Sequence, residues 1–396
     1  MAALERETMN MQEINIQAFT DIIKFDLENG EYSPIVGIGL SGIGKTESIF
    51  DITQELGIGF KELRLVAMNE LDILGMPEAV DINGVKSTTY AANENLPREG
   101  RDPEVGLLVL DEFTSGSEAL RTACYQLMDS KRALGSYKLP PKWKIIVLGN
   151  GPDDGGNFQG ATAAELSRCL CFRVVAKLED WKAWAYKHGI NSTVIAYLTQ
   201  NPDSLHKMDT ESEYASVFPC PRSWAALSKR LNMLEEKKGT LDDMTVMVYA
   251  AGAVGAKEAA EFQVFYRYNN QMFDIDALVK KGVMPSNIDS ISEEALLISS
   301  LKVGRMLQGI IDEEPDIMNI SDECISSAAS VCNFILAVWK SPAKGIDTAT
   351  TVFSEISNAC PDLYGITIDD SDTRFSEQCP EYASFRRKLL DLLKTR

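Results

Sequence analysis

The sequence has few histidines, no C-x-x-C pair and no long apolar run. His188 and His206 are its only imidazoles, so the ligand spacing of a zinc site is missing. We therefore expect the eight cysteines to be buried thiols in a reducing compartment. The longest apolar stretch, at 244–256, is too short to span a bilayer and predicts a buried helix. The N-terminal residues lack the apolar core of a signal peptide, which favours a cytoplasmic protein with no membrane association.

Basic residues are also scarce. The chain carries 39 Lys and Arg against 58 Asp and Glu, a net charge of −19. Broad binding to nucleic acid or to an anionic membrane needs clustered Lys and Arg, so this balance disfavours both. Glycine and proline are not in excess, and 45% hydrophobic residues is an ordinary globular value. At 396 residues, the chain should divide into two or three domains.

Short apolar stretches alternate with helical patterns over the first part of the chain. Strands are predicted at 34–39, 61–68, 105–113, 142–150 and 170–177, and helices at 12–28, 45–56 and 117–130. This alternation predicts an α/β fold with a parallel sheet. The nearly all-apolar stretch VGLLVLDEF is typical of a central strand buried on both faces. The segment 75–101, with several Gly, Pro and Asn residues, predicts a long irregular functional loop.

The pattern becomes helical almost throughout after residue 178. Helices are predicted at 180–189, 192–201, 222–239 and 241–271, and the helical pattern continues beyond 273 between prolines. We therefore predict three domains, an α/β domain at 1–178, an α-helical domain at 179–273 and a helical C-terminal extension at 274–396.

One glycine-rich stretch matches the pattern G-x-x-x-x-G-K-[ST] without a break. Its residues, with the one that follows, are Gly39, Leu40, Ser41, Gly42, Ile43, Gly44, Lys45, Thr46 and Glu47. Glycines let backbone N–H groups close around phosphate oxygens, Lys45 would reach the β- and γ-phosphates, and the Thr46 hydroxyl would hold Mg²⁺. The following helix would direct its positive end at the anion. The alternative is a tight turn with a solvated lysine.

Polar side chains follow two of the predicted buried strands. Asp111 would belong to the Mg²⁺ shell, and Glu112 would activate the attacking water as general base. Asn150 would orient that water against the γ-phosphate. The alternatives are a strand that simply ends in acidic residues and an Asn-Gly turn.

Arginines could complete such a site. Arg168 would act in trans, at a subunit boundary, on the charge of phosphoryl transfer. Its rival Arg173 lies in a strand pattern that favours a structural role. Arg222, at the start of a helix, would contact the γ-phosphate and link nucleotide state to domain position; the alternative is a solvated residue after a proline turn.

The order of glycine loop, LVLDEF, IIVLGN, LSR and CPRSW resembles a MoxR-like AAA+ ATPase over about residues 30–268. In that family these are Walker A, Walker B, sensor 1, the arginine finger and sensor 2. Further pieces, such as LDILGMPEAVDINGV and GINSTVIAYLTQNPDSLH, are similar to a bacterial and phage branch of the family. The neighbours of Arg168 depart from the pattern, since Ser167 and Cys169 stand where the family has Asp and Phe. The segment 274–396 resembles no family.

The resemblance implies ATP and Mg²⁺ as cofactors, a homo-hexameric ring and a protein client, with a von Willebrand factor A domain protein as a possible partner. It also implies that loops at 75–100 and 133–141 contact clients, with Tyr90 and Tyr137 as contact aromatics or as ordinary packed side chains. The leading hypothesis is an ATP-driven motor that remodels a protein. A nucleic-acid motor and a nucleotide-gated scaffold with slow hydrolysis are the alternatives.

Overall fold

The computed structural model describes residues 11–91, 93–135, 137–151, 167, 169–208, 217–314, 320–368 and 373–395. The chain divides into two compact units. The first runs to Trp181 and includes Cys220–Arg222, and most of the second follows from Lys182 and Ser223. The three-domain division at 178 and 273 stays a prediction.

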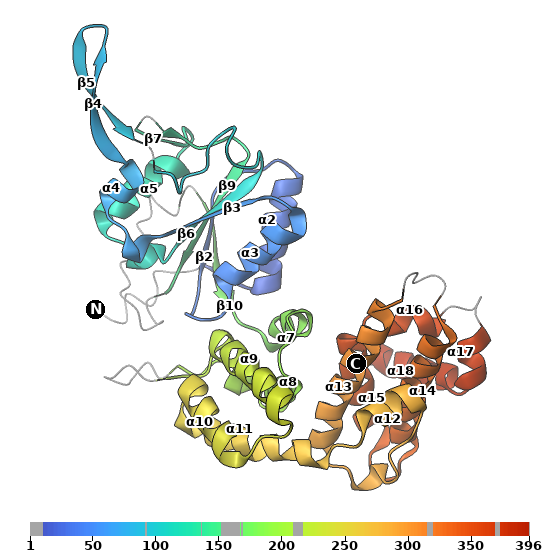
Figure 1. Ribbon diagram of the computed structural model, residues 1–396. Helices are drawn as coiled ribbons and strands as arrows, with labels where there is room; N and C mark the ends of the chain where they lie inside the picture. The colour runs from blue at the N-terminus through green and yellow to red at the C-terminus, as the bar shows by residue number, and fades with distance from the viewer. Residues whose placement is uncertain are drawn as a thin grey trace. The chain divides into compact units, whose positions relative to one another are not determined.

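The first unit is built on a six-stranded parallel sheet (Figure 1). The strand order is β1-β10-β2-β9-β6-β3. The strands are β1 Gln12–Asn15, β2 Ile35–Ile38, β3 Gly59–Arg64, β6 Gly106–Asp111, β9 Trp143–Gly149 and β10 Leu170–Val175. All neighbouring pairs are parallel, so the predicted α/β fold with a parallel sheet is confirmed.

Helices cover both faces of this sheet. They are α2 Ile16–Glu28, α3 Lys45–Leu56, α4 Glu70–Leu74 and α5 Glu118–Met128. Leu107 and Val109 of β6 pack in one core with α2 and α3, whereas Leu108 and Leu110 pack in the other with α5. Because side chains alternate along a strand, an all-apolar β6 can fill both cores. The prediction of a strand buried on both faces is therefore confirmed.

The chain start differs from the prediction. A helix was expected over 12–28, but its first four residues form β1, and only the rest is α2. β1 pairs with β10, where Glu13 lies opposite Arg173 and forms an ion pair with it at 3.4 Å. The Asn15 side chain then caps α2 by accepting from the backbone N–H of Ala18 at 2.9 Å. Pairing with a distant strand thus decides the conformation of a stretch whose own sequence is helical.

The segment expected to be irregular, 75–101, instead contains a regular antiparallel hairpin, β4 Met76–Ile82 and β5 Val85–Ala91. Its turn is Asn83-Gly84, and both residues have positive φ, 55° and 83°. Asn-Gly is the preferred sequence for such a two-residue turn. The prediction of an irregular loop was therefore wrong, although the sequence contains the signal for a hairpin. The hairpin projects from the sheet in Figure 1, and its side chains are mostly exposed. A smaller hairpin joins β7 Ala133–Leu134 to β8 Tyr137–Lys138.

The described residues after β10 form helices and connecting turns. The helices are α7 Leu178–Lys187, α8 Ser192–Gln200, α9 Pro221–Lys238, α10 Asp243–Val254, α11 Ala256–Tyr266, α12 Ile275–Lys281, α13 Glu293–Asp312, α14 Asp322–Lys340, α15 Gly345–Ala359, α16 Leu363–Ile368, α17 Thr373–Gln378 and α18 Tyr382–Thr395. Short 3₁₀ turns are η1 Leu65–Ala67, η2 Phe113–Ser115, η3 Pro202–Leu205, η4 Arg267–Gln271 and η5 Ile288–Ser290. Within the described ranges, every helix is too short or too polar to cross a bilayer.

The apolar stretch at 244–256 was expected to be a buried helix, but α10 is buried on one side only. Val246, Ala250 and Val254 are buried at helical spacing, whereas Met244 and Val248 are 72% and 60% exposed. One apolar face therefore packs and the other meets solvent. The cysteines are closer to expectation, since all eight lie in the described residues without a disulfide bond and six of them are buried.

In the second unit, helices from before and after residue 273 pack on one another. Lys182 of α7 forms an ion pair with Glu355 of α15 at 2.5 Å, with side chains 14% and 5% exposed. Tyr186 donates to the same carboxylate, and Arg305 of α13 donates to the Ser192 hydroxyl at 3.2 Å. A continuous apolar core then fills the C-terminal helices. These contacts explain why Lys182–Lys207 and Ser223–Arg396 belong to one compact unit.

A buried carboxylate in this unit leads to a testable prediction. Glu258 accepts from the Tyr197 hydroxyl at 2.5 Å and from Lys207 at 2.9 Å. Burial alone would raise the pKa of Glu258, but hydrogen bonds from Ser204, Tyr197 and Lys207 outweigh it and lower the pKa below 4.5. A depressed carboxyl pKa contributes stability above its unfolded value and loses it as the pH falls through the folded value. Glu258→Gln should therefore cost about 1–3 kcal/mol at pH 7.

Urea unfolding of the wild type and of Glu258→Gln between pH 7 and pH 3.5 measures this effect. The difference between the two should shrink as the pH falls below the pKa of the unfolded carboxyl, because the unfolded wild type then binds a proton that the folded protein binds only at lower pH. Glu261→Gln, on the exposed side of the same helix, is the control. Equal losses for the two variants would contradict the role assigned to Glu258.

Candidate nucleotide-binding site

The glycine loop lies between β2 and α3, at the carboxyl edge of the sheet. Gly42 and Gly44 have φ of 77° and 102°, a region that L side chains rarely adopt. Gly39 is packed so closely that a Cβ there would lie 2.1 Å from the Val174 carbonyl oxygen. Ile43 is 3% exposed and anchors the loop in the core. Each of the three glycines of the motif thus has a local structural reason.

The loop holds the Lys45 ammonium. Its Nζ donates to the carbonyls of Gly39 at 2.6 Å and Leu40 at 2.9 Å, and lies 3.4 Å from Asn150 Oδ1. The residue is only 8% exposed. Gly44, the N-cap of α3, has no side chain to satisfy the first N–H groups of that helix. A cation and uncapped helix amides at one place fit a phosphate.

Thr46 and Asp111 meet across the site. The Thr46 hydroxyl, in the first turn of α3, donates to Asp111 Oδ2 at 3.0 Å, at the end of β6. The other carboxylate oxygen of Asp111 accepts from the backbone N–H of Glu112 at 2.9 Å. A hydroxyl and a carboxylate side by side are the hard oxygen donors that Mg²⁺ prefers, so the residues present fit this metal.

Glu112 has an unusual backbone. Its φ is 53°, in the left-handed region where a non-glycine residue is strained. This conformation turns the chain sharply from buried β6 into η2, and the Glu112 side chain stays partly exposed beside Asp111. Since strain of this kind collects at functional sites, the observation supports a role for Glu112 beyond packing.

The structure therefore brings together Lys45, Thr46, Asp111 and Asn150, with Glu112 next to Asp111. They come from the ends of β2, β6 and β9, which are neighbours in the sheet. In open parallel sheets, ligands bind outside the carboxyl ends of the strands. Glu47 lies in the exposed part of the first turn of α3, and Ser41 is half-buried in the loop.

The predicted arginines are placed differently. The backbone N–H of Arg222 donates to the Gly42 carbonyl at 3.1 Å, while its side chain is exposed. Cys220 packs so tightly on the loop that a Cβ on Gly42 would come 2.7 Å from its Sγ. Contact of the Arg222 side chain with a phosphate stays a prediction. Arg168 lies outside the described residues, and Arg173 is held in the sheet by Glu13.

Two neighbours of the site were missed. Arg64 ends β3 and lies opposite Asp111 in the strand register. The pKa of its guanidinium is raised, first by a hydrogen bond to Glu62 and also by the charges of Asp111 and Glu112. Thr114 is the second, and it is bonded to the end of β9. The position of Arg64 at the end of a predicted strand could have indicated it.

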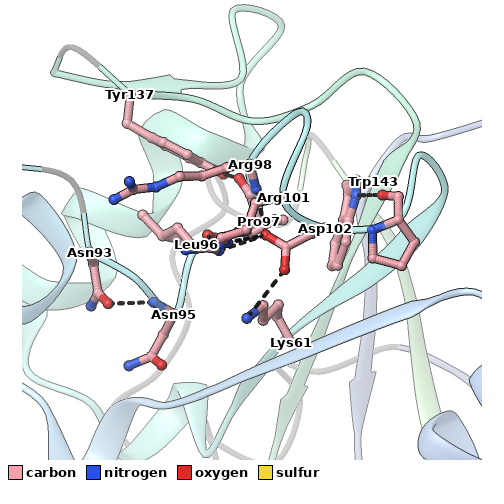
Figure 2. Close-up of polar contacts among 11 residues, drawn as sticks. Lys61, Asn93, Asn95, Leu96, Pro97, Arg98, Arg101, Asp102, Tyr137 and Trp143 are labelled. Atoms are coloured by element: carbon pink, nitrogen blue, oxygen red, sulfur yellow. Dashed lines mark hydrogen bonds and ion pairs between the residues drawn. The ribbon is translucent and has the colours of Figure 1, made fainter.

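The segment after the long hairpin, 93–103, is held by a polar network centred on Asp102 (Figure 2). Asp102 accepts from the backbone of Arg98 and from the side chain of Arg101, both at 2.8 Å. Burial alone would raise the pKa of Asp102, but these hydrogen bonds and the charge of Lys61 outweigh it and lower the pKa. The Tyr137 hydroxyl donates to the Pro97 carbonyl at 2.7 Å. The hairpin thus stands beside an ordered segment, and Tyr137 is engaged in its packing.

No protein-family model and no curated protein sequence matches the chain. Among solved structures, the chain is similar to a candidate ATPase from Cytophaga hutchinsonii, at 11% identity and a TM-score of 0.30, over 95% of this chain and 90% of that chain. It is also similar to a RuvB variant from Thermotoga maritima, at 11% identity and a TM-score of 0.30, over 87% of this chain and 84% of that chain.

Proposed function

We propose that the protein is a Mg²⁺-dependent ATPase of the AAA+ class, of the MoxR-like kind, that uses hydrolysis to remodel a protein client. The observation that carries this proposal is the contact of Thr46 with Asp111 beside the loop-held Lys45. A solvated lysine after an ordinary turn would have no reason to be buried, nor to lie within reach of Asn150.

The residues take distinct tasks in this proposal. The amides of the glycine loop and of α3 bind phosphate oxygens, and Lys45 exchanges its carbonyl contacts for them. Thr46 and Asp111 hold Mg²⁺, which when bound neutralises charge on the phosphates. Glu112 accepts the proton of the attacking water, and Asn150 orients that water. Adenine over guanine is proposed from the family resemblance alone.

Assembly and client binding extend the proposal. A homo-hexameric ring would let Arg168 of one subunit act at the site of its neighbour, and Arg222 would couple the bound nucleotide to the α-helical domain predicted at 179–273, which would act as a lid. The long hairpin is the proposed client contact, because its exposed apolar side chains gather near the tip and the base. They are Met76 at 63%, Ile82 at 55%, Val85 at 64% and Tyr90 at 37% exposed. A von Willebrand factor A domain protein is the proposed partner.

Phosphate release with Mg-ATP tests the proposal. Lys45→Ala should lower kcat/KM by about 10²-fold, because a charge aimed at the phosphates is lost. Lys131→Ala, at an exposed position of the same unit, is the control. EDTA should abolish turnover, and the mass in each nucleotide state should reveal the ring. A wild type that releases no phosphate, alone or with client present, would overturn the proposal.

A further inference from the structure

The turn after β6 and the end of β9 are joined by one side chain. Thr114 lies in η2, two positions after Glu112, and is 1% exposed. Its hydroxyl accepts from the backbone N–H of Asn150 at 3.0 Å and donates to the Asn150 carbonyl at 3.0 Å. A single hydroxyl thus satisfies both main-chain groups of the residue that faces Lys45.

Close packing reinforces this contact. A Cβ on Gly149 would lie 2.8 Å from Thr114 Cγ2 and 2.9 Å from its Oγ1. The absence of a side chain at Gly149 therefore lets the end of β9 approach η2. Both the methyl and the hydroxyl of Thr114 contact this strand end, so its rotamer has little freedom.

Thr114 contacts the end of β9 beyond the point where β6 and β9 pair in the sheet. The register of β6 with β9 runs from Gly106 opposite Trp143 to Leu110 opposite Val147. Beyond that pair, the segment that carries Glu112 turns away into η2, while β9 continues to Gly149, the residue before Asn150. Thr114 bonds the two chains just past the last ladder pair. Without it, the spacing of Glu112 and Asn150 would depend on the strained turn at Glu112 and on the pairing of β9 with β2, where Gly149 lies opposite Ile38.

We propose that Thr114 is a positioning residue, which sets Glu112 and Asn150 at the separation needed to flank one water molecule. This inference rests on the proposed function. Thr114 itself does not contact the water or the nucleotide. It acts through Asn150, whose side-chain oxygen lies 3.4 Å from Lys45 Nζ. Misplacement of a reacting group by about 1 Å can cost 10²-fold in rate. Loss of the hydrogen bonds between Thr114 and Asn150 should therefore lower kcat.

Thr114→Val keeps the shape and removes the hydroxyl. We expect kcat for ATP hydrolysis to fall about 10- to 100-fold, while the Kd for Mg-ATP stays within about threefold. Thr114→Ser and Thr114→Ala form a second pair, which differs only in the hydroxyl. The serine variant should stay within about threefold of the wild type and the alanine variant should follow Val. This pair keeps the test valid if the valine variant folds poorly.

A readout that needs no nucleotide accompanies the kinetics. In Thr114→Val without nucleotide, the backbone N–H of Asn150 should exchange its hydrogen at least about 10-fold faster than in the wild type, because the hydroxyl that accepts from it is gone. The loss of kcat in Thr114→Val with Asn150→Ala should equal that in Asn150→Ala alone, since both variants break one chain of contacts.

The outcomes separate the two proposals. A wild type that releases no phosphate overturns the proposed ATPase function. Faster exchange of the Asn150 backbone amide in Thr114→Val would then still show that Thr114 holds the end of β9. An active wild type with unchanged kcat in Thr114→Val overturns the positioning role, as do additive losses in the double variant. A rise in Kd equal to the fall in kcat/KM would assign Thr114 to nucleotide binding instead and also overturn it.

Discussion

Replacement of Glu112 by Gln is expected to lower phosphate release about 10³-fold and to leave ATP binding within about threefold of the wild type. Gln has the shape of Glu and accepts the same left-handed backbone, but it cannot take a proton from water. The contacts of Asp111 with Thr46 and with the backbone of residue 112 remain available. The nucleotide should therefore bind and stay unhydrolysed.

Single-turnover phosphate release and equilibrium ATP binding measure the two halves of this prediction. Glu118→Gln, at an exposed position of the first turn of α5, is the matched control. The mass of the assembly that Glu112→Gln forms with ATP should also stay constant over time, because the ATP is not hydrolysed. If Glu112→Gln hydrolyses ATP at the wild-type rate, another group activates the water. If the variant no longer binds ATP, Glu112 has a structural role.

The largest effect on stability is expected at Lys144. This lysine lies in β9, is 0% exposed, and its Nζ is 2.9 Å from Asp26 Oδ2. It also donates to the carbonyls of Ser33 at 2.5 Å and Glu31 at 3.2 Å. Burial, the largest effect, lowers the pKa of Lys144, and the contact with Asp26 opposes that change. Lys144→Met would leave a buried carboxylate and two carbonyls without their cation, at a cost of about 3–5 kcal/mol.

Denaturant unfolding of the full chain measures this cost. Asp26→Asn should also destabilise, and the double variant should lose less than the sum of the two, because the singles each leave one partner behind. Lys142→Met is the control, since Lys142 pairs with Glu104 in solvent, with side chains 48% and 78% exposed. That exposed pair should contribute little to stability, because solvent screens it. Equal losses at 142 and 144 would contradict the argument.

The strands β2, β6, β9 and β10 could be predicted because each is a short apolar run with its own boundary signals, whereas β3 begins two residues before its predicted start. The central strand β6 and the helix α3 begin and end close to the predicted residues. β1 could not, because its conformation depends on pairing with β10, which lies far along the chain. The long hairpin escaped because both its faces are exposed and its side chains show no alternation of apolar and polar residues. The Asn-Gly turn was the usable signal.

The site shows the same division. Lys45, Thr46 and Asp111 follow from a motif and a strand end, so sequence places them at one edge of a parallel sheet. The bond of Thr114 to Asn150 joins positions 36 residues apart, and it depends on where two strands stop relative to one another. No local pattern carries that information. The backbone contact of Arg222 with the glycine loop is of the same kind.

The long hairpin has a consequence for how such a protein can change over evolutionary time. Its first and last residues, Met76 and Ala91, lie opposite each other, so the chain leaves and rejoins the fold at one point. A segment attached in this way can be lengthened, shortened or exchanged without moving the sheet, because the entropy of closing a longer loop rises only slowly. On the proposed function, a lineage could acquire a new client by rewriting this ribbon alone, while the hydrolytic residues stay under separate selection.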